Sequence, residues 1–235
     1  MLDAFAITLE GHAYSEASAA RCIETAAEHG LAVQKFRAVP ACEAEAVMQA
    51  HGLRWTWGYG GSLKHHPYPG GRLARIGCAM SHYLLWKKCA EEGEMLILEH
   101  DAVFQRRLPD IEWKGICQIN DPTGATPKGA WWAEQMGKRG PGVWPKTRIF
   151  DDSRPDGLAG NSAYLLKPWA AKGLIEAYQQ QGVWPNDATM CIQHFPYLQE
   201  LYPFITRVEQ KESTTSQPDP KANNELTWSF RPARL

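Results

Sequence analysis

The sequence predicts an α/β domain with a mostly parallel central sheet that is flanked by helices. The chain opens with a strand–helix–strand pattern over residues 5–39, and parallel neighbours need such a crossover helix between them. A helical pattern over residues 76–92 leads into the apolar run at 95–98, which is short enough for a buried strand. Another strand–helix pair follows at residues 162–181. This alternation indicates a single α/β domain.

Start and stop signals bound the individual elements. Ser15 suits the N-cap of the first helix and Gly30 its end, while Pro168 and Gly182 suit the two ends of a later helix. The strands are expected at residues 5–9, 31–39, 95–98, 162–166 and 204–208. The helices are expected at residues 15–29, 43–50, 76–92, 168–181 and from Asp187 to about Phe195.

Three stretches are expected to be irregular or rich in loops. Residues 55–71 are rich in glycine and aromatic side chains, and residues 121–157 carry five prolines and six glycines. A loop as long as 121–157 inside a compact domain is usually functional or disordered. We therefore expect one domain over residues 1–216, with a long Gly/Pro/Trp-rich loop insertion at 121–157, and an irregular tail at 217–235.

Composition excludes several classes of protein. The net charge of -1 gives no overall attraction to nucleic acid or to an anionic membrane. No apolar run approaches the roughly 20 residues of a membrane span, and the N-terminus lacks the basic start of a signal peptide. The six cysteines form no Cys-x-x-Cys pair, which favours reduced, mostly buried thiols. A cytoplasmic protein without a transmembrane segment is expected.

Two acids follow the strand at 95–98 directly. Glu99 and Asp101 are one residue apart, and ligands of α/β folds gather at the carboxyl ends of strands. Two carboxylates there are suited to a hard divalent cation that holds phosphate oxygens. The alternative is that both acids simply end a strand and cap a turn.

Two motifs together resemble glycosyltransferase family 25, which includes lipooligosaccharide and collagen galactosyltransferases. The first is Gly77-Cys-Ala-Met-Ser-His82 at the start of a helix, and the second is Leu96-Ile-Leu-Glu-His-Asp-Ala102 at the end of a strand. Weaker similarities follow in order along the chain. They are Gly160-Asn-Ser-Ala-Tyr164, Pro185-Asn-Asp187 and Tyr202-Pro203. The resemblance spans about residues 5–216, and its specific part is the block from Gly77 to Ala102.

The resemblance implies a GT-A-type single domain and the transfer of a sugar, expected from a UDP-sugar, to an acceptor hydroxyl with inversion. It implies that Asp101 and Glu99 bind a divalent metal, Mn²⁺ or Mg²⁺, and that Glu99 contacts the donor. The family has an acid at the middle position of this motif, where this chain has His100. Asp187 is the expected general base, and the alternative is that it only caps a helix.

The donor and acceptor sites are expected in different parts of the chain. The nucleotide sugar is expected to meet Thr8, Arg72, Arg75, Ser81, Glu99 and Asn161, and Tyr164 is a further candidate for either site. The acceptor is expected to meet the basic and aromatic side chains of the insertion, because this composition suits sugars, phosphates and bases. They are Trp131, Trp132, Trp144, Lys138 and Arg139. The alternative for this segment is a solvated excursion with a small apolar cluster.

Three readings of the function remain open at this point. The first is a transferase that acts on a cell-surface glycan such as lipopolysaccharide. The second is a phage-type enzyme that glycosylates hydroxymethylated cytosine in DNA, against which the net charge argues mildly. The third is a non-catalytic relative that binds a nucleotide sugar. A zinc site is not expected, because the candidate ligands show no recognised spacing. These candidates are His65, His66, His82, Cys78 and His100.

Overall fold

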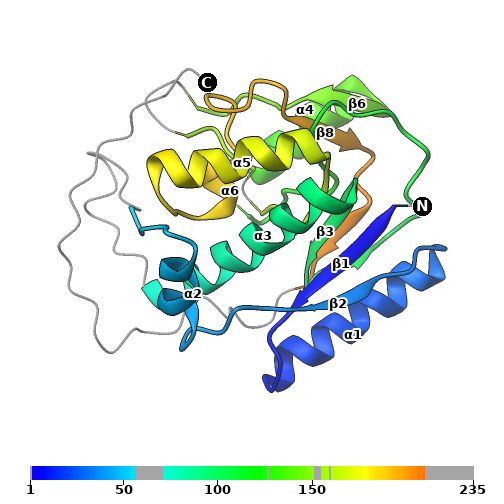
Figure 1. The fold of residues 1–235 in the computed structure, drawn as a ribbon. Helices are drawn as coiled ribbons and strands as arrows, with labels where there is room; N and C mark the ends of the chain where they lie inside the picture. The colour runs from blue at the N-terminus through cyan, green and yellow to red at the C-terminus, as the bar shows by residue number, and fades with distance from the viewer. Residues whose placement is uncertain (1, 57–70, 126, 151–154, 159, 210–235) are drawn as a thin grey trace.

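The computed structural model describes residues 2–56, 71–125, 127–150, 155–158 and 160–209. Most of the irregular stretch expected at 55–71 and the whole tail expected at 217–235 lie outside these residues, as do His65 and His66. Within the described part, a seven-stranded sheet lies between helices (Figure 1). No helix among the described residues is both long enough and apolar enough to cross a membrane.

The central sheet is mixed, with most of its strands running the same way. Its order is β2-β1-β3-β7-β5-β8-β6. The pairing directions place β2, β1, β3, β5 and β8 in one direction and β7 and β6 in the other. The prediction of a mostly parallel sheet is therefore confirmed. The strands are β1 (Asp3–Thr8), β2 (Gln34–Arg37), β3 (Met95–Glu99), β5 (Ile116–Gln118), β6 (Gly142–Pro145), β7 (Ala163–Leu166) and β8 (Gln199–Tyr202).

A second sheet has two strands and begins immediately after the acidic motif. Strand β4 (Ala102–Phe104) pairs antiparallel with β9 (Thr206–Val208). It also joins the first helix, because the backbone N–H of Phe104 donates to the hydroxyl of Thr25 at 3.2 Å. The chain therefore turns sharply between Glu99 and Ala102 and leaves the central sheet at the site of the two acids.

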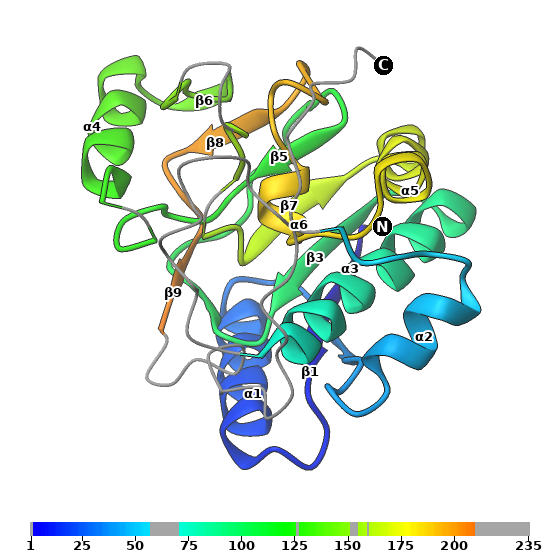
Figure 2. The ribbon, with the colours of Figure 1, turned by 90° about the vertical axis from the view of Figure 1, so that its left-hand side faces the viewer.

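The helices cover the sheet on both faces (Figure 2). Helix α1 lies on one face, and α2, α3, α5 and α6 lie on the other. Alternation along β1 follows this division, since Phe5 and Ile7 pack with α3 while Ala4 and Ala6 pack with α1. The helices are α1 (Ala13–Glu28), α2 (Ala44–Ala50), α3 (Arg72–Glu92), α4 (Gly129–Arg139), α5 (Pro168–Gln181) and α6 (Asn186–Thr189).

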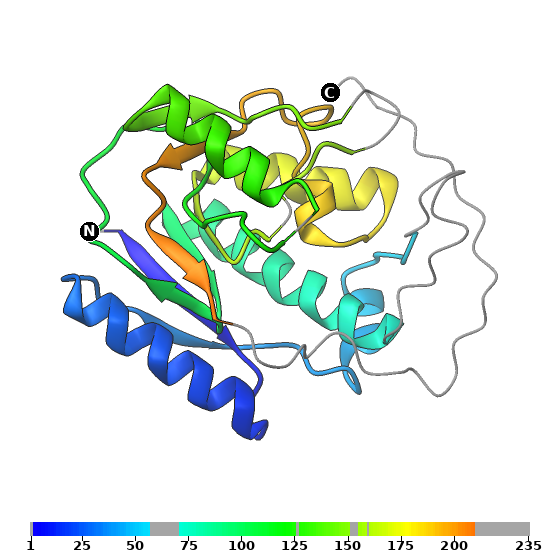
Figure 3. The same cartoon turned by 180° about the vertical axis from the view of Figure 1, so that it is seen from behind.

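The insertion expected to be loop-rich over 121–157 contains two regular elements. They are helix α4 and the edge strand β6, which pack on β8 (Figure 3). Trp132 and Met136, four residues apart, pack against Phe204 and bury one face of α4. Lys138 and Arg139 in the last turn favour the helix electrostatically. Tertiary packing thus stabilises a helix in a segment whose glycines and prolines favour loops.

Several element boundaries also differ from the expected ones, and three of the helices are affected. Helix α1 starts at Ala13 with His12 as its N-cap, and the hydroxyl of Ser15 instead accepts from the backbone N–H of Leu9. Helix α3 begins four residues earlier than expected, at Arg72. Helix α6 ends at Thr189 and does not continue to Phe195. The short strands β4, β5, β6 and β8 were not expected, because three or four residues are too few for a clear periodic pattern.

Candidate functional site

A cleft of about 190 Å³ opens at the edge of the sheet where the parallel strands end. It brings together four of the residues that the sequence singles out, although they are far apart along the chain. The full lining is Arg75 and Cys78 from α3, Glu99 from β3, Gly160, Asn161 and Ser162 before β7, and Pro185, Asn186 and Asp187 at the start of α6.

Antiparallel pairing of β3 with β7 creates this arrangement. Leu98 is opposite Ala163, and the backbone N–H of Glu99 donates to the carbonyl of Ser162 at 2.8 Å. The end of β3 and the beginning of β7 therefore lie at the same edge of the sheet. Asn161 and Ser162 are placed beside the acidic motif for this reason.

The two predicted metal ligands have different surroundings. The side chain of Glu99 is 32% exposed toward the cleft, whereas Asp101 is 4% exposed and its Oδ1 has no hydrogen-bond partner among the described residues. Burial and the neighbouring Glu99 raise the pKa of Asp101 to about 7, although hydrogen bonding from Ser162 opposes the shift. Asp101 is not among the residues that line the cleft. A divalent cation near both carboxylates would offset the burial of Asp101 and its repulsion from Glu99, so the chemistry of this pair suits the predicted metal.

His100, in the middle of the motif, faces away from the cleft. Its ring makes an edge-on contact with Tyr14 at 6.1 Å, at the beginning of α1. Burial lowers the pKa of His100, and a hydrogen bond to the backbone of Ile7 partly offsets this effect. His100 therefore belongs to the contact between β1, β3 and α1, and it is not among the residues that line the cleft.

A chain of buried hydrogen bonds runs from the core to Glu99. Trp86 Nε1 donates to the hydroxyl of Tyr164 at 2.8 Å. That hydroxyl lies 2.9 Å from His82 Nδ1, and His82 Nε2 lies 3.3 Å from Oε1 of Glu99. If the Tyr164 O–H donates to Nδ1, the proton of His82 is on Nε2 and donates to Glu99. His82 and Tyr164 are thus placed to hold the Glu99 carboxylate in one orientation.

Asp187 lies in the first turn of α6, on the wall of the cleft formed by this helix. Its carbonyl accepts from the backbone N–H of Leu158 at 2.9 Å, and its Oδ1 accepts from the N–H of Ala188 at 2.9 Å. Burial and the charge of Glu99 raise the pKa of Asp187 to about 6. A carboxylate with this pKa is suited to accept a proton near neutral pH.

The Gly-Cys-Ala-Met-Ser-His motif divides into two pairs of residues with different surroundings. Gly77 and Ser81 face the segment after β2, where the Ser81 hydroxyl donates to the Gly77 carbonyl at 2.7 Å and accepts from the Val39 N–H at 2.9 Å. Cys78 and His82 face Glu99. The prediction that Ser81 binds the donor is corrected here: its side chain is fully buried and its hydroxyl is engaged in this packing.

We expect Gly77→Ala to destabilise the fold. A Cβ at Gly77 would lie 2.4 Å from the carbonyl oxygen of Val39, so the segment after β2 must move. Such overpacking costs about 1–3 kcal/mol. The control is Gly173→Ala in α5, whose Cβ would meet its nearest atoms at 3.5 and 3.6 Å. Thermal unfolding of both variants measures the difference, and an equal or higher melting temperature for Gly77→Ala would contradict this account.

Two further predicted donor-binding residues lie outside the cleft lining. Arg72 pairs with Glu45 of α2 at 2.8 Å on the surface. Thr8, at the end of β1, is 1% exposed and its hydroxyl donates to the carbonyl of Ala6 at 3.0 Å. Tyr164 also lies beneath the cleft, with no exposed surface.

The predicted acceptor-binding residues lie on α4 and β6, at the far edge of the sheet from the β3–β7 cleft. Trp131 is 45% exposed, but Trp132 is fully buried against Met136 and Phe204, so it cannot belong to a binding surface. Trp144 donates from Nε1 to the carbonyl of Gly140 at 2.9 Å. Lys138 pairs with Glu134, and Arg139 donates to the Pro145 carbonyl at 2.8 Å.

Five residues of the lining were not expected as site residues. Asn186 is 5% exposed and accepts from the thiol of Cys78 at 3.8 Å, Pro185 precedes it, and Gly160 and Ser162 precede β7. The signal for Cys78 was present in the sequence, since it lies four residues before His82 and shares a helix face with it. The other four lie within two residues of Asn161 or Asp187.

Comparison with known proteins gives one family match. The model of glycosyltransferase family 25 (LPS biosynthesis protein) matches residues 24–120. This segment runs from α1 to β5 and includes α3, β3 and the acidic motif. None of the curated proteins matches the chain.

Proposed function

We propose that this chain, whose residues 24–120 match the model of glycosyltransferase family 25, transfers a sugar from a nucleotide-sugar donor, a UDP-sugar, to an acceptor hydroxyl with inversion. The observation that carries this proposal is the cleft that Glu99, Arg75 and Asp187 line together. It combines Glu99 of the acidic motif, a cation suited to phosphate and a carboxylate suited to act as a base.

The leaving group of the proposed reaction is a nucleoside diphosphate. Asp101 and Glu99 would hold the divalent metal, Mn²⁺ or Mg²⁺, which supplies positive charge to the departing diphosphate. Arg75 lies in the first turn of α3, where the backbone N–H groups of the helix start also favour an anion. His82, held by Tyr164, orients the Glu99 carboxylate.

Asp187 is the proposed general base. The acceptor hydroxyl loses its proton to Asp187 while its oxygen attacks the anomeric carbon, and the bond from that carbon to the diphosphate breaks. One base of this kind is enough for inversion, because a single displacement needs no covalent intermediate. Asp187 lines the cleft from α6, whereas Arg75 lines it from α3 and Glu99 from β3.

Arg75→Gln is expected to weaken UDP binding. Charge-assisted hydrogen bonds contribute about 1.5–3 kcal/mol, so the dissociation constant should rise roughly tenfold to hundredfold. Arg72→Gln is the matched control, because Arg72 lies three residues earlier and pairs with Glu45 outside the cleft. Isothermal titration with UDP and Mn²⁺ compares the two. Equal losses in both variants would remove Arg75 from the proposed donor site.

The proposed acceptor is a glycan of the lipopolysaccharide type, in line with the description of the matched family. Trp131, with Lys138 and Arg139 nearby on α4, gives an exposed aromatic and basic surface, a composition that suits an anionic glycan. Because α4 lies beside the edge strand β6 and away from the β3–β7 cleft, this surface would contact only those sugars of a long acceptor that are far from the reacting hydroxyl.

A donor screen tests the proposal as a whole. The intact protein is incubated with UDP-, GDP- and CMP-sugars and Mn²⁺, with a lipopolysaccharide acceptor, with hydroxymethylated DNA, or with neither. We expect turnover of a UDP-sugar that the glycan accelerates and DNA does not. If none of the sugars is consumed and UDP does not bind, the transferase proposal fails. If DNA is the acceptor, transfer should fall steeply with salt, because phosphate contacts release counterions.

A further inference from the structure

We propose that Cys78, His82 and Glu99 form a binding site for a thiophilic divalent cation such as Zn²⁺, open to solvent through the cleft. This site shares Glu99 with the pair that the proposed function assigns to Mn²⁺ or Mg²⁺, and it replaces Asp101 by Cys78 and His82. It includes a thiolate and an imidazole, whereas the other pair consists of carboxylates alone.

The fold places the three ligand atoms together. Cys78 and His82 lie four residues apart on α3 and therefore project from the same face of the helix. That face meets the end of β3, where Oε1 of Glu99 lies 3.3 Å from His82 Nε2. One ligand atom from each of the three residues lies within 4.8 Å of the others. Small side-chain adjustments bring such a set around one cation with metal–ligand distances of about 2.0–2.3 Å.

The chemistry of these ligands suits zinc and its analogues. Sulfur, nitrogen and oxygen donors are typical zinc ligands, and three protein ligands with an open fourth position are typical of accessible zinc sites. Cys78 and Glu99 both line the cleft, so an ion can enter and a water molecule can complete the coordination. Binding takes the proton of the Cys78 thiol into solvent. The two negative ligands then balance the charge of the ion.

The surroundings of His82 match those of a metal-bound histidine. Such a histidine usually makes a hydrogen bond from its second nitrogen to a group that fixes the ring. His82 Nδ1 lies 2.9 Å from the hydroxyl of Tyr164, and the His82 ring is fully buried. With the ion on Nε2, the proton is on Nδ1 and donates to the Tyr164 oxygen. That oxygen has two lone pairs and also accepts from Trp86.

The sequence alone did not indicate this site. Cys78 and His82 were considered as zinc ligands, but the third ligand is 17 residues after His82 and on another element. The inference does not rest on transferase activity. It requires only that the helix and the strand meet as they do in the structure. Ligand softness separates the two kinds of cation, since thiolate favours zinc and carboxylate pairs favour magnesium or manganese.

Cobalt titration of the reduced, metal-stripped full chain tests the inference. Co²⁺ replaces Zn²⁺ in such sites, and a thiolate ligand gives it a charge-transfer band in the near ultraviolet. We expect this band to saturate at one equivalent and to disappear when Zn²⁺ is added. Cys78→Ser should abolish the band. Cys42→Ser is the control and should keep it, because Cys42 is exposed on the surface and the other four cysteines are buried.

Tyr164→Phe provides a second, independent variant. It keeps the ring and removes the hydroxyl near His82, so the affinity for Zn²⁺ should fall about 10- to 100-fold while the cobalt band remains. The inference is overturned if the folded protein gives no thiolate band, or if the band survives in Cys78→Ser and is lost in Cys42→Ser. UDP binding is measured in a separate titration. Failure of UDP to bind would contradict the transferase proposal without affecting the cobalt result, and absence of the cobalt band would contradict the zinc site without affecting UDP binding.

Discussion

Asp187→Asn is expected to lower kcat for sugar transfer by about 10²- to 10⁴-fold, the usual contribution of a positioned general base. Asparagine keeps the size of the side chain but cannot accept the acceptor's proton. UDP binding should change little, because the base acts on the acceptor and not on the diphosphate. Steady-state kinetics and UDP titration of the same preparation separate these two effects. Equal kcat in the variant and the parent would refute the assignment of Asp187.

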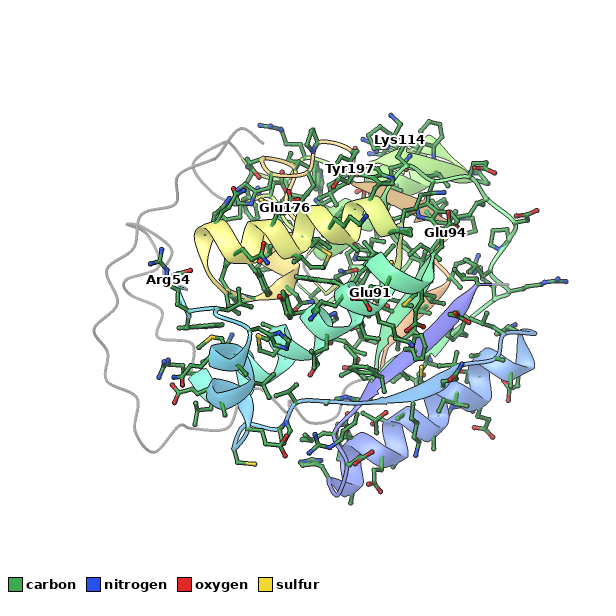
Figure 4. The ribbon with its side chains drawn as sticks, in the orientation of Figure 1. Arg54, Glu91, Glu94, Lys114, Glu176 and Tyr197 are labelled. Atoms are coloured by element: carbon green, nitrogen blue, oxygen red, sulfur yellow. The ribbon has the colours of Figure 1, made fainter. Side chains whose placement is uncertain are left out.

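The pH dependence gives a second readout for Asp187. The base works only when it is ionised, and burial with the charge of Glu99 raises its pKa from 3.8 to about 6. The rate should therefore rise with pH up to about 6 and then level, and this rise should be absent in Asp187→Asn. Glu176→Gln is the matched control, because Glu176 lies on the outer surface of α5 (Figure 4) and should leave the profile unchanged.

Asp101→Asn is expected to stabilise the metal-free protein and to remove its response to Mn²⁺. The folded state holds the pKa of Asp101 at about 7, against 3.8 for the free side chain. As pH rises from about 4 to 7, the unfolded chain releases this proton first, so stability is lost through this window and stays low above it. The penalty at pH 8 is on the order of 3 kcal/mol. An uncharged asparagine avoids the penalty.

Calorimetry at pH 8 and pH 4.5, with and without Mn²⁺, measures this effect. Without metal, Asp101→Asn should unfold roughly 6–12 °C above the parent at pH 8, and the difference should shrink at pH 4.5. Mn²⁺ should raise the melting temperature of the parent only, because a cation bound to the folded state stabilises it. The control is Asp110→Asn, on the surface. A destabilised Asp101→Asn at pH 8 would show that the carboxylate contributes favourable contacts instead.

The parts of the fold that could be predicted from sequence are those with long, clear patterns. The apolar run of β3 and the long helix before it are both predicted from the sequence. The strand is expected at 95–98 and is observed at Met95–Glu99. Strand β5 is only three residues long and is held by its neighbours β7 and β8, so nothing local marks it. Helix α4 depends on burying Trp132 against Phe204, a contact between distant segments that sequence patterns do not reveal.

The residues of the candidate site that could be predicted are mainly those with charged side chains in recognisable motifs, such as Glu99 and Asp187. Glu99, Arg75, Asn161 and Asp187 are named from the sequence and line one cleft in the structure. Ser81 was misassigned because a hydroxyl that binds a ligand and one that binds a neighbouring backbone look the same in sequence. The orientation of His100 toward Tyr14 likewise depends on how β3 pairs with β1, which only the assembled sheet shows.

The two pairs of residues within the Gly77–His82 motif have different structural roles. Gly77 and Ser81 allow α3 to approach the backbone at Val39, and any descendant that keeps the fold must keep this close approach. Cys78 and His82 contribute no such contact to that backbone and face Glu99 instead. Substitutions at Cys78 or His82 would therefore change the candidate site without changing the contact between α3 and Val39. The first pair of the motif therefore serves the packing of the fold, whereas the second pair faces the candidate site.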